Sequence, residues 1–134
     1  FMSYIVDTYC MLVDYLCIFK VIVPSPQASE NAGSSLTITA TLSGATDETV
    51  TVALSTSGTA TEGTDYTDGS GNLDDITISA GSTTGTVSVT PTEDSIYDGT
   101  SNETATVSIS SVSGGSATES GTQSVTITIT DNEN

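Results

Sequence analysis

From residue 35 onward, apolar and polar residues alternate one by one along several short runs. In the first run, residues 35–43, the apolar residues Leu36, Ile38, Ala40 and Leu42 alternate with Ser and Thr. A period of two places the apolar side chains on one face of a β-strand and the hydroxyl side chains on the other. The same alternation recurs in five later runs: 49–54, 76–79, 85–90, 105–110 and 124–130.

Clusters of Gly, Asp, Asn and Ser separate these runs, and none of the runs has the period of an amphipathic helix. Their Val, Ile and Thr residues favour strands. Six strands, with a seventh expected before Glu30, predict an all-β fold, an immunoglobulin-like antiparallel β-sandwich of about seven strands. The chain has no Trp, and both Cys precede the runs, so the disulfide core of antibody domains is not expected.

The first 26 residues are a different kind of sequence. They hold both Cys, both Met, both Phe and the only Lys, and they end at Pro24 and Pro26. We therefore divide the chain into an apolar N-terminal segment, residues 1–26, and a sandwich domain, residues 27–134. Within the segment the Tyr, Val, Ile and Phe content favours a strand, whereas polar and small residues recur at helical spacing. These are Ser3, Asp7, Cys10, Asp14 and Cys17.

Two interpretations of the N-terminal segment stay open. A leader or tag is one, although the segment lacks a basic stretch and a small-residue cleavage site. An assembly element that buries its apolar side chains in a neighbouring subunit is the other, since an exposed apolar run would aggregate. A membrane span is disfavoured, because Asp7 and Asp14 would each cost about 3 kcal/mol at mid-bilayer. Cys10 and Cys17 form no zinc site without His or further Cys, and their redox state stays open.

The excess of acidic residues argues against nucleic acid as a partner and favours cations. The chain has 17 acidic residues, one Lys, no Arg and no His, with a formal net charge of −16. Nucleic-acid binding needs Lys and Arg to neutralise phosphates, so nucleic acid is excluded as a partner. A compact domain with this charge repels itself unless cations bind or salt screens it. We therefore expect a folded domain in a cation-rich medium.

The acidic residues of the sandwich domain gather in loops between the predicted strands. Loops at one end of a sandwich are far apart in sequence but adjacent in space. Ca²⁺ takes six to eight oxygen ligands at flexible spacing, whereas Mg²⁺ keeps more water and Zn²⁺ prefers Cys and His. The pattern favours Ca²⁺, and a solvated acidic rim adapted to salt is the alternative. The candidate residues are Glu30, Asp65, Glu93, Asp94, Asp98, Glu103, Asp131 and Glu133.

Four motifs, in order, resemble the successive signatures of a Calx-β domain. They are ASENAG (28–33), GTATEGTDY (58–66), TEDSIYDGTSNET (92–104) and VTITITDNE (125–133). The resemblance implies an immunoglobulin-like sandwich that binds Ca²⁺ at one end, as in sodium–calcium exchangers, integrin β4 and long bacterial surface adhesins. By position, the resemblance implies Ca²⁺ ligands at Glu30, Asp65, Asp94, Asp98 and Asp131. It leaves Glu93, Glu103 and Glu133 as weaker candidates.

These observations predict a non-catalytic, extracellular or cell-surface Ca²⁺-binding structural or adhesion module. Its partners would be adjacent repeats of the same protein or neighbouring copies of itself, and the sequence does not identify an adhesive target. The alternative is a subunit of a self-assembling extracellular filament in which residues 1–23 pack into a neighbour. An enzyme is disfavoured, because only carboxylate pairs are available for acid–base chemistry and Ca²⁺ explains them better.

Overall fold

The computed structural model describes residues 17–22, 27–30, 35–69, 71–93 and 102–132, and within them it forms ten β-strands and no helix. The strands are β1 (Cys17–Ile22), β2 (Gln27–Ser29), β3 (Leu36–Leu42), β4 (Val50–Gly58), β5 (Tyr66–Thr67), β6 (Ile76–Ile78), β7 (Thr84–Pro91), β8 (Glu103–Ser113), β9 (Thr118–Glu119) and β10 (Ser124–Thr130).

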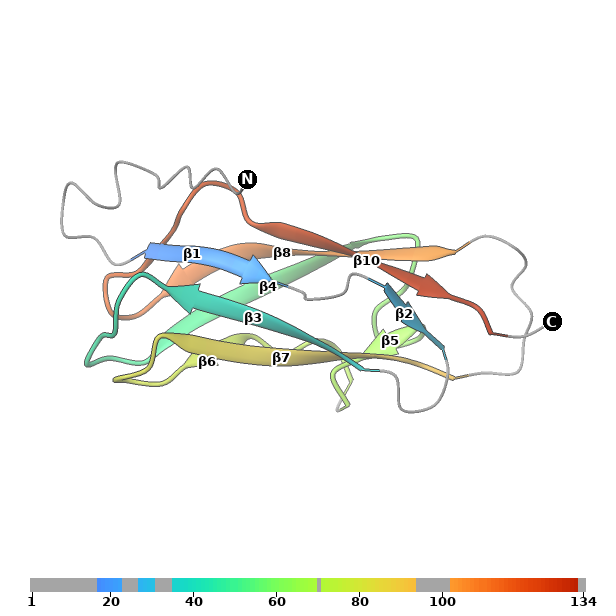
Figure 1. The fold of residues 1–134 in the computed structure, drawn as a ribbon, viewed down its shortest axis with the longest axis horizontal. Helices are drawn as coiled ribbons and strands as arrows, with labels where there is room; N and C mark the ends of the chain where they lie inside the picture. The colour runs from blue at the N-terminus through green and yellow to red at the C-terminus, as the bar shows by residue number, and fades with distance from the viewer. Residues whose placement is uncertain (1–16, 23–26, 31–34, 70, 94–101, 133–134) are drawn as a thin grey trace.

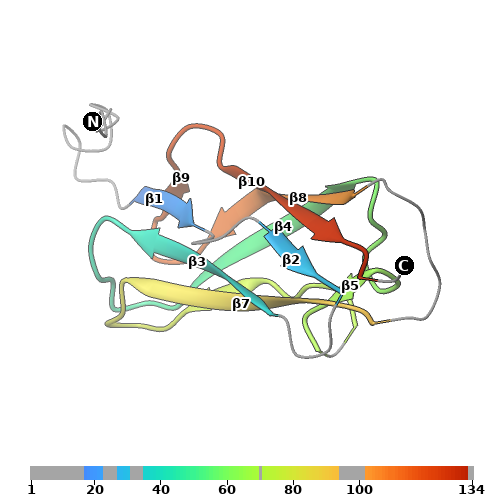
Figure 2. The ribbon, with the colours of Figure 1, turned by 45° about the vertical axis from the view of Figure 1, so that its right-hand side comes forward.

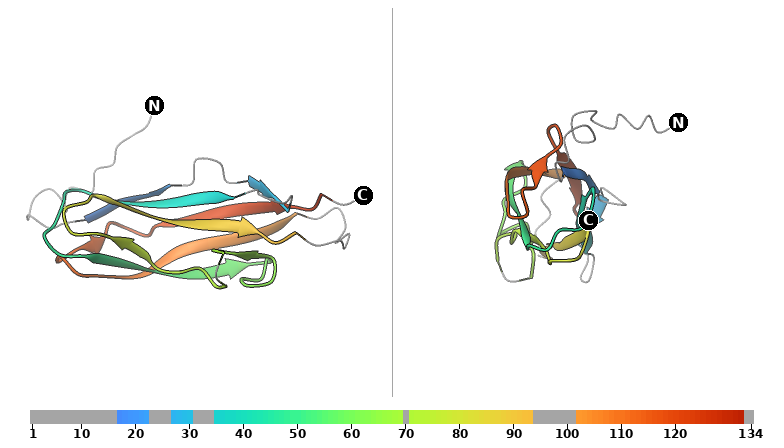
Figure 3. Two further views of the ribbon diagram at one scale, coloured as in Figure 1. Left: turned by 90° about the horizontal axis from the view of Figure 1, so that it is seen from below. Right: turned by 90° about the vertical axis from the view of Figure 1, so that its left-hand side faces the viewer.

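Two five-stranded sheets pack face to face as a sandwich (Figure 1; Figure 3). The first sheet has the order β5-β7-β3-β1-β9, and the second has the order β2-β10-β8-β4-β6. Adjacent strands are antiparallel except for β1 with β9 and β2 with β10, which are parallel. Figure 2 shows β3 and β7 side by side in the first sheet. The predicted all-β sandwich is confirmed.

The core between the sheets is built from the alternate apolar residues of the strands. In β3, Ile38 and Ala40 are fully buried, while Thr37 is exposed. All six strands predicted from the period of two are present, because one buried face sets the register of each strand. Burying an aliphatic side chain contributes about 1.5 to 3 kcal/mol, so a core of this kind can form without a disulfide. The largest fully buried side chains include Tyr66, Ile38, Ile76, Ile78, Ile127 and Ile129.

β1 lies inside the segment that the sequence pattern separates from the sandwich. Its residues pair antiparallel with β3, from Ile18 opposite Leu42 to Ile22 opposite Thr39, and its start pairs parallel with β9. The backbone of residues 17–22 therefore occupies an inner position of the first sheet, and burial of the segment's apolar side chains in a neighbouring subunit stays a prediction. Strand propensity prevails over helical spacing there, since a strand completes the ladder between β3 and β9. Residues 1–16 lie outside the described residues.

The edge of β4 is closed by a side chain where its neighbouring strand ends. β6 pairs only with Val50–Val52, and a bulge leaves Ser110 of β8 unopposed between Ala53 and Leu54. The backbone N–H of Leu54 donates to Asp75 Oδ1 at 3.2 Å. Asp75 thus replaces a strand partner at an open sheet edge, which is a structural task.

Gly58 ends β4 against the first residues of β8. It has a φ of +124°, and a Cβ at this position would collide with the backbone carbonyl of Thr104. The close approach lets Ala60 donate its N–H to Thr104 O at 2.9 Å. Gly69 also has a positive φ, +101°, but a Cβ built there would meet no other atom. A substitution at Gly69 therefore strains the backbone without causing a collision.

We predict that Gly58→Ala destabilises the domain more than Gly69→Ala. The shared positive φ costs about 1 to 3 kcal/mol in each variant. Forcing a methyl group into the backbone of β8 adds about 1 to 3 kcal/mol in Gly58→Ala alone. Urea unfolding of the two variants measures the difference, and equal losses would contradict the close approach of β4 to β8.

Candidate metal centre

Five of the eight candidate ligands belong to the described residues, and all five lie at one end of the sandwich. They are Glu30, Asp65, Glu93, Glu103 and Asp131. The other three, Asp94, Asp98 and Glu133, lie outside the described residues. The end in question is the one where β2, β7 and β10 finish and where β5 and β8 begin (Figure 1).

Three of these acidic residues sit at neighbouring strand ends of the second sheet. Ser29 of β2 pairs with Thr130 of β10, so Glu30 and Asp131 each follow a paired position. The ladder continues past the last β2 residue, since Glu30 N donates to Thr130 O at 3.1 Å. Glu103, the first residue of β8, lies opposite Ile129 of β10. The register of β2, β10 and β8 therefore sets the relative position of these carboxylates.

The other two acidic residues sit where β5 meets the end of β7 in the first sheet. Tyr66 pairs with Pro91, and Thr92 N donates to Asp65 O at 2.9 Å, so Asp65 and Glu93 flank this short ladder. The two sheets are linked at this end, because Asn132 Nδ2 donates to Glu93 Oε1 at 3.3 Å. Carboxylates from both sheets thus share one end of the molecule.

The local environment at this end favours a bound cation. Glu30 is 6% exposed and is the one buried charged side chain among the described residues. The only basic residue of the chain is Lys20, and β1 places it opposite Thr41, toward the other end of β3. A buried carboxylate is costly without a compensating charge, and nearby carboxylates add repulsion.

The described carboxylates gather at this end but do not close around one point. Among the described residues, no three acidic side chains lie close enough together to hold one metal ion. Their chemistry nevertheless fits Ca²⁺, because every candidate donor is a carboxylate oxygen and residues 27–134 contain no Cys and no His. These oxygens come from five separate segments of the chain.

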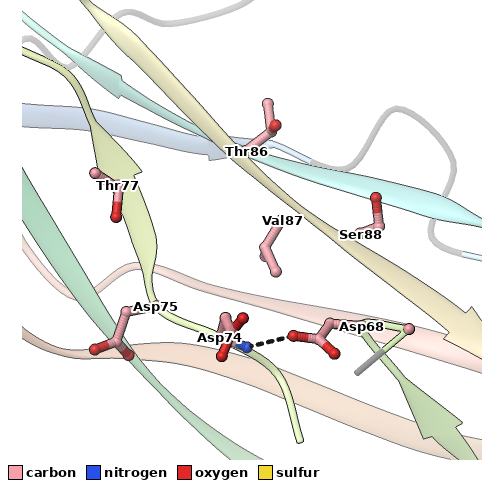
Figure 4. A pocket seen from close by; sticks show the side chains of 8 residues that line it. Asp68, Asp74, Asp75, Thr77, Thr86, Val87 and Ser88 are labelled. Atoms are coloured by element: carbon pink, nitrogen blue, oxygen red, sulfur yellow. Dashed lines mark hydrogen bonds between the residues drawn. The ribbon is translucent and has the colours of Figure 1, made fainter. Parts of the chain in front are cut away.

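A second group of acidic residues lies along the groove between β6 and β7 and has a structural role. The groove has a volume of about 500 Å³ and is lined partly by Asp68, Asp74 and Asp75 (Figure 4). Asp68 accepts hydrogen bonds from Gly71 N at 3.2 Å and from Asp74 N at 3.1 Å. The Asp68 carboxylate thus accepts hydrogen bonds from two backbone N–H groups of the loop before β6, and the Asp75 carboxylate accepts one from Leu54 N of β4.

Glu62 is a functional candidate that the sequence analysis missed. Its Oε2 accepts a hydrogen bond from Thr56 Oγ1 at 2.7 Å, and its Oε1 accepts one from Leu73 N. The available signal was its place inside GTATEGTDY, three residues before Asp65. It was overlooked because acidic residues were sought at strand ends, whereas Glu62 holds a loop against a strand.

The fold is an all-β sandwich whose described acidic candidates gather at one end, and a family comparison identifies its class. The family model described as Calx-beta domain matches residues 16–133. The chain belongs to the Calx-β domain family. The match includes β1, so the family domain begins before the boundary that the composition suggested at residue 27.

Two solved structures share this fold. The crystal structure of CBD12 from CALX1.2 has 19% sequence identity and a TM-score of 0.62, and the match covers 79% of this chain but only 40% of that chain. The crystal structure of the apo-form Calx CBD1 domain has 17% identity and a TM-score of 0.63, with 88% of this chain and 98% of that chain covered. None of the curated proteins matches the sequence. No helix in the described part of the chain is long and apolar enough to cross a membrane.

Tyr66 anchors the loop of Asp65 in the core and is itself held in the neutral form. The side chain is 1% exposed. Burial raises the pKa of the Tyr66 hydroxyl, and the charges of Glu62 and Asp65 raise it further, while a hydrogen bond with Thr56 lowers it. The net direction is upward, so the folded state favours the phenol over the phenolate.

We predict that Tyr66 makes the domain sensitive to alkali. Because the folded-state pKa of Tyr66 lies above the unfolded value of about 10, its contribution is complete below pH 10 and is lost as pH rises through the folded-state pKa. Tyr66→Phe should therefore show a flatter fall in unfolding free energy as the pH rises above about 10. Urea unfolding across this range is the measurement, and parallel profiles of the two proteins would contradict the assignment. The other four Tyr residues are present in both proteins, so their contributions cancel in the difference between the two pH profiles.

Proposed function

We propose that this chain is a non-catalytic Ca²⁺-binding module in which loop carboxylates at one end of the sandwich bind calcium. The observation that carries the proposal is the gathering of Glu30, Asp65, Glu93, Glu103 and Asp131 at that end, from five segments of the chain. Membership of the Calx-β domain family supports the same conclusion. Asp94, Asp98 and Glu133, which flank these residues in the sequence, complete the proposed ligand set.

The bound ion supplies two positive charges that offset the repulsion among these carboxylates. Glu30 and Asp131 bring the ends of β2 and β10, and Asp65 and Glu93 bring the loops around β5 and β7. Joining these segments through one ion stabilises both sheets where their hydrogen-bond ladders stop. The module would therefore be stiffer with calcium than without it, because the ion binds the folded state and not the unfolded chain.

An extracellular or cell-surface setting fits this mechanism. A chain with a formal net charge of −16 suits a medium rich in calcium and salt. The shape also suits an extended protein, since β1 begins at the end of the sandwich opposite to the one where β10 finishes (Figure 1). Modules joined end to end would lie in a row, as in long surface adhesins, with adjacent repeats of the same protein as their partners.

The alternative function is a subunit of a self-assembling extracellular filament. In this alternative, the apolar residues before β1 pack into a neighbouring copy, or β1 itself is exchanged between copies. β1 favours the second route, because the ladder that it forms with β3 could be formed by the same strand of a neighbour. Filaments in electron micrographs that vanish on deletion of residues 1–16 would support the first route over a single module, and filaments that persist in this deletion would support exchange of β1.

We predict that Ca²⁺ raises the thermal midpoint of the domain. A ligand that binds only the folded state adds RT ln(1 + [L]/Kd), about 2.7 kcal/mol at a hundredfold excess over Kd. Calorimetry after chelation and then in millimolar Ca²⁺ measures this shift.

Mg²⁺ at the same concentration and NaCl at matched ionic strength are the controls. Mg²⁺ should stabilise less, since it releases its bound water reluctantly, and NaCl should add only screening. An unchanged midpoint in Ca²⁺ would refute the proposal, and equal shifts in all three salts would indicate a diffuse acidic rim.

A further inference from the structure

Glu62 is a half-buried carboxylate that connects three parts of the chain. It lies in the loop between β4 and β5, its Oε2 accepts from Thr56 Oγ1 in β4, and its Oε1 accepts from Leu73 N beyond β5. Hydrogen bonds to a charged acceptor are roughly twice as strong as neutral ones. Glu62 therefore ties its own turn and Leu73 to β4.

The turn that contains Glu62 also holds Asp65. Asp65 N donates to Thr61 O at 2.8 Å, Thr61 N donates back to Asp65 Oδ2, and Gly63 N donates to Tyr66 O at 2.8 Å. Gly63 supports this tight turn with a φ of +81°. Since Glu62 and Asp65 belong to one hydrogen-bonded turn, fixing the side chain of Glu62 fixes where the Asp65 carboxylate lies.

The contacts of Glu62 argue against its being an ion ligand itself. Both of its oxygens already accept hydrogen bonds from inside the chain, one of them from a backbone N–H. A metal ion at Glu62 would compete with these donors, and a partly buried N–H that loses its acceptor is costly. Asp65 differs, because the hydrogen bond that its carboxylate accepts from Thr61 N goes to Oδ2.

We propose that Glu62 is a positioning residue that pre-organises Asp65 for Ca²⁺; this inference rests on the proposed function. By holding the turn in place before the ion arrives, Glu62 reduces the ordering cost of binding. Thr56 takes part in the same arrangement, since it donates to Glu62 and also bonds the hydroxyl of the buried Tyr66. The affinity for the ion thus depends on hydrogen bonds made by groups that do not touch it.

Three variants separate positioning from direct coordination. Glu62→Ala removes both hydrogen bonds, and Thr56→Val removes one donor without changing any charge. Glu62→Gln keeps an oxygen for Leu73 N and offers Thr56 Oγ1 an amide donor, so it should largely rescue the turn. Asp65→Ala is the positive control, and Asp47→Ala, at an exposed position in the β3–β4 loop, is the negative control.

The experiment is titration of the full chain with Ca²⁺ and with Tb³⁺, whose luminescence lifetimes in H₂O and D₂O report the number of bound waters. Each titration is run below the ion-free thermal midpoint of the variant, which is measured separately. We expect Glu62→Ala to weaken binding by about tenfold, as for loss of a hydrogen bond to a charged group. Thr56→Val should weaken binding in the same direction, Glu62→Gln should stay close to wild type, and the number of bound waters should not change.

Each other outcome has a distinct meaning. Glu62→Ala and Thr56→Val could lower the ion-free thermal midpoint and leave the affinity for the ion unchanged. This result would mean that Glu62 has a purely structural role, and it would overturn the inference. An added bound water in Glu62→Ala, with equal affinity losses in Glu62→Ala and Glu62→Gln, would make Glu62 a ligand and also overturn it. Failure of the wild-type chain to bind either ion would instead refute the proposed function.

Discussion

The repulsion among carboxylates at one end of the sandwich is the constraint on which the rest of the structure depends. The pairing of β10 with β2 and with β8 brings Glu30, Glu103 and Asp131 to adjacent strand ends. Glu30 is buried there. The chain has one Lys and no Arg or His with which to offset these charges. Hydrogen bonds, solvation and a metal ion can offset the repulsion, and among metal ions the carboxylate oxygens favour a hard divalent cation.

The same side-chain chemistry serves two different purposes in this domain. At the site end, carboxylates lie at or next to strand ends and are the proposed calcium ligands. Along the edge of β4 beyond Val52, carboxylates instead accept hydrogen bonds from the chain, with Asp75 bound to Leu54 N and Glu62 bound to Thr56 Oγ1. The acidic composition of the sequence therefore does not by itself identify which carboxylates bind a metal ion. The place of each acidic residue in the fold and its hydrogen-bond partners must be considered together.

The strands and the acidic end could be predicted from the sequence, because both depend on local patterns. Alternation of Ile38 and Ala40 with Thr identifies a strand with one buried face, and the acidic residues that follow such strands must lie near a sandwich end. Two-residue strands such as β5 and β9 have no pattern to detect, since they exist only through pairing with Pro91 and with Cys17. β1 was set apart because its composition differs from the other strands, although its pairing with β3 does not depend on composition. Glu62 was missed because its role is visible only once Thr56 and Leu73 lie beside it.

Mapping of backbone amide shifts by two-dimensional NMR during a calcium titration tests the central claim most directly. If calcium binds where the strand ends gather, saturable shifts should appear in the amides of Thr61, Thr92 and Asp131 and leave those of Glu48 and Gly115 unchanged. Glu48 and Gly115 are suitable references, because Gly115 N donates to Glu48 Oε2 at 2.8 Å in the loops at the opposite end. Shifts spread over both ends, or shifts reproduced by NaCl alone, would contradict a calcium site and leave only a screened acidic surface.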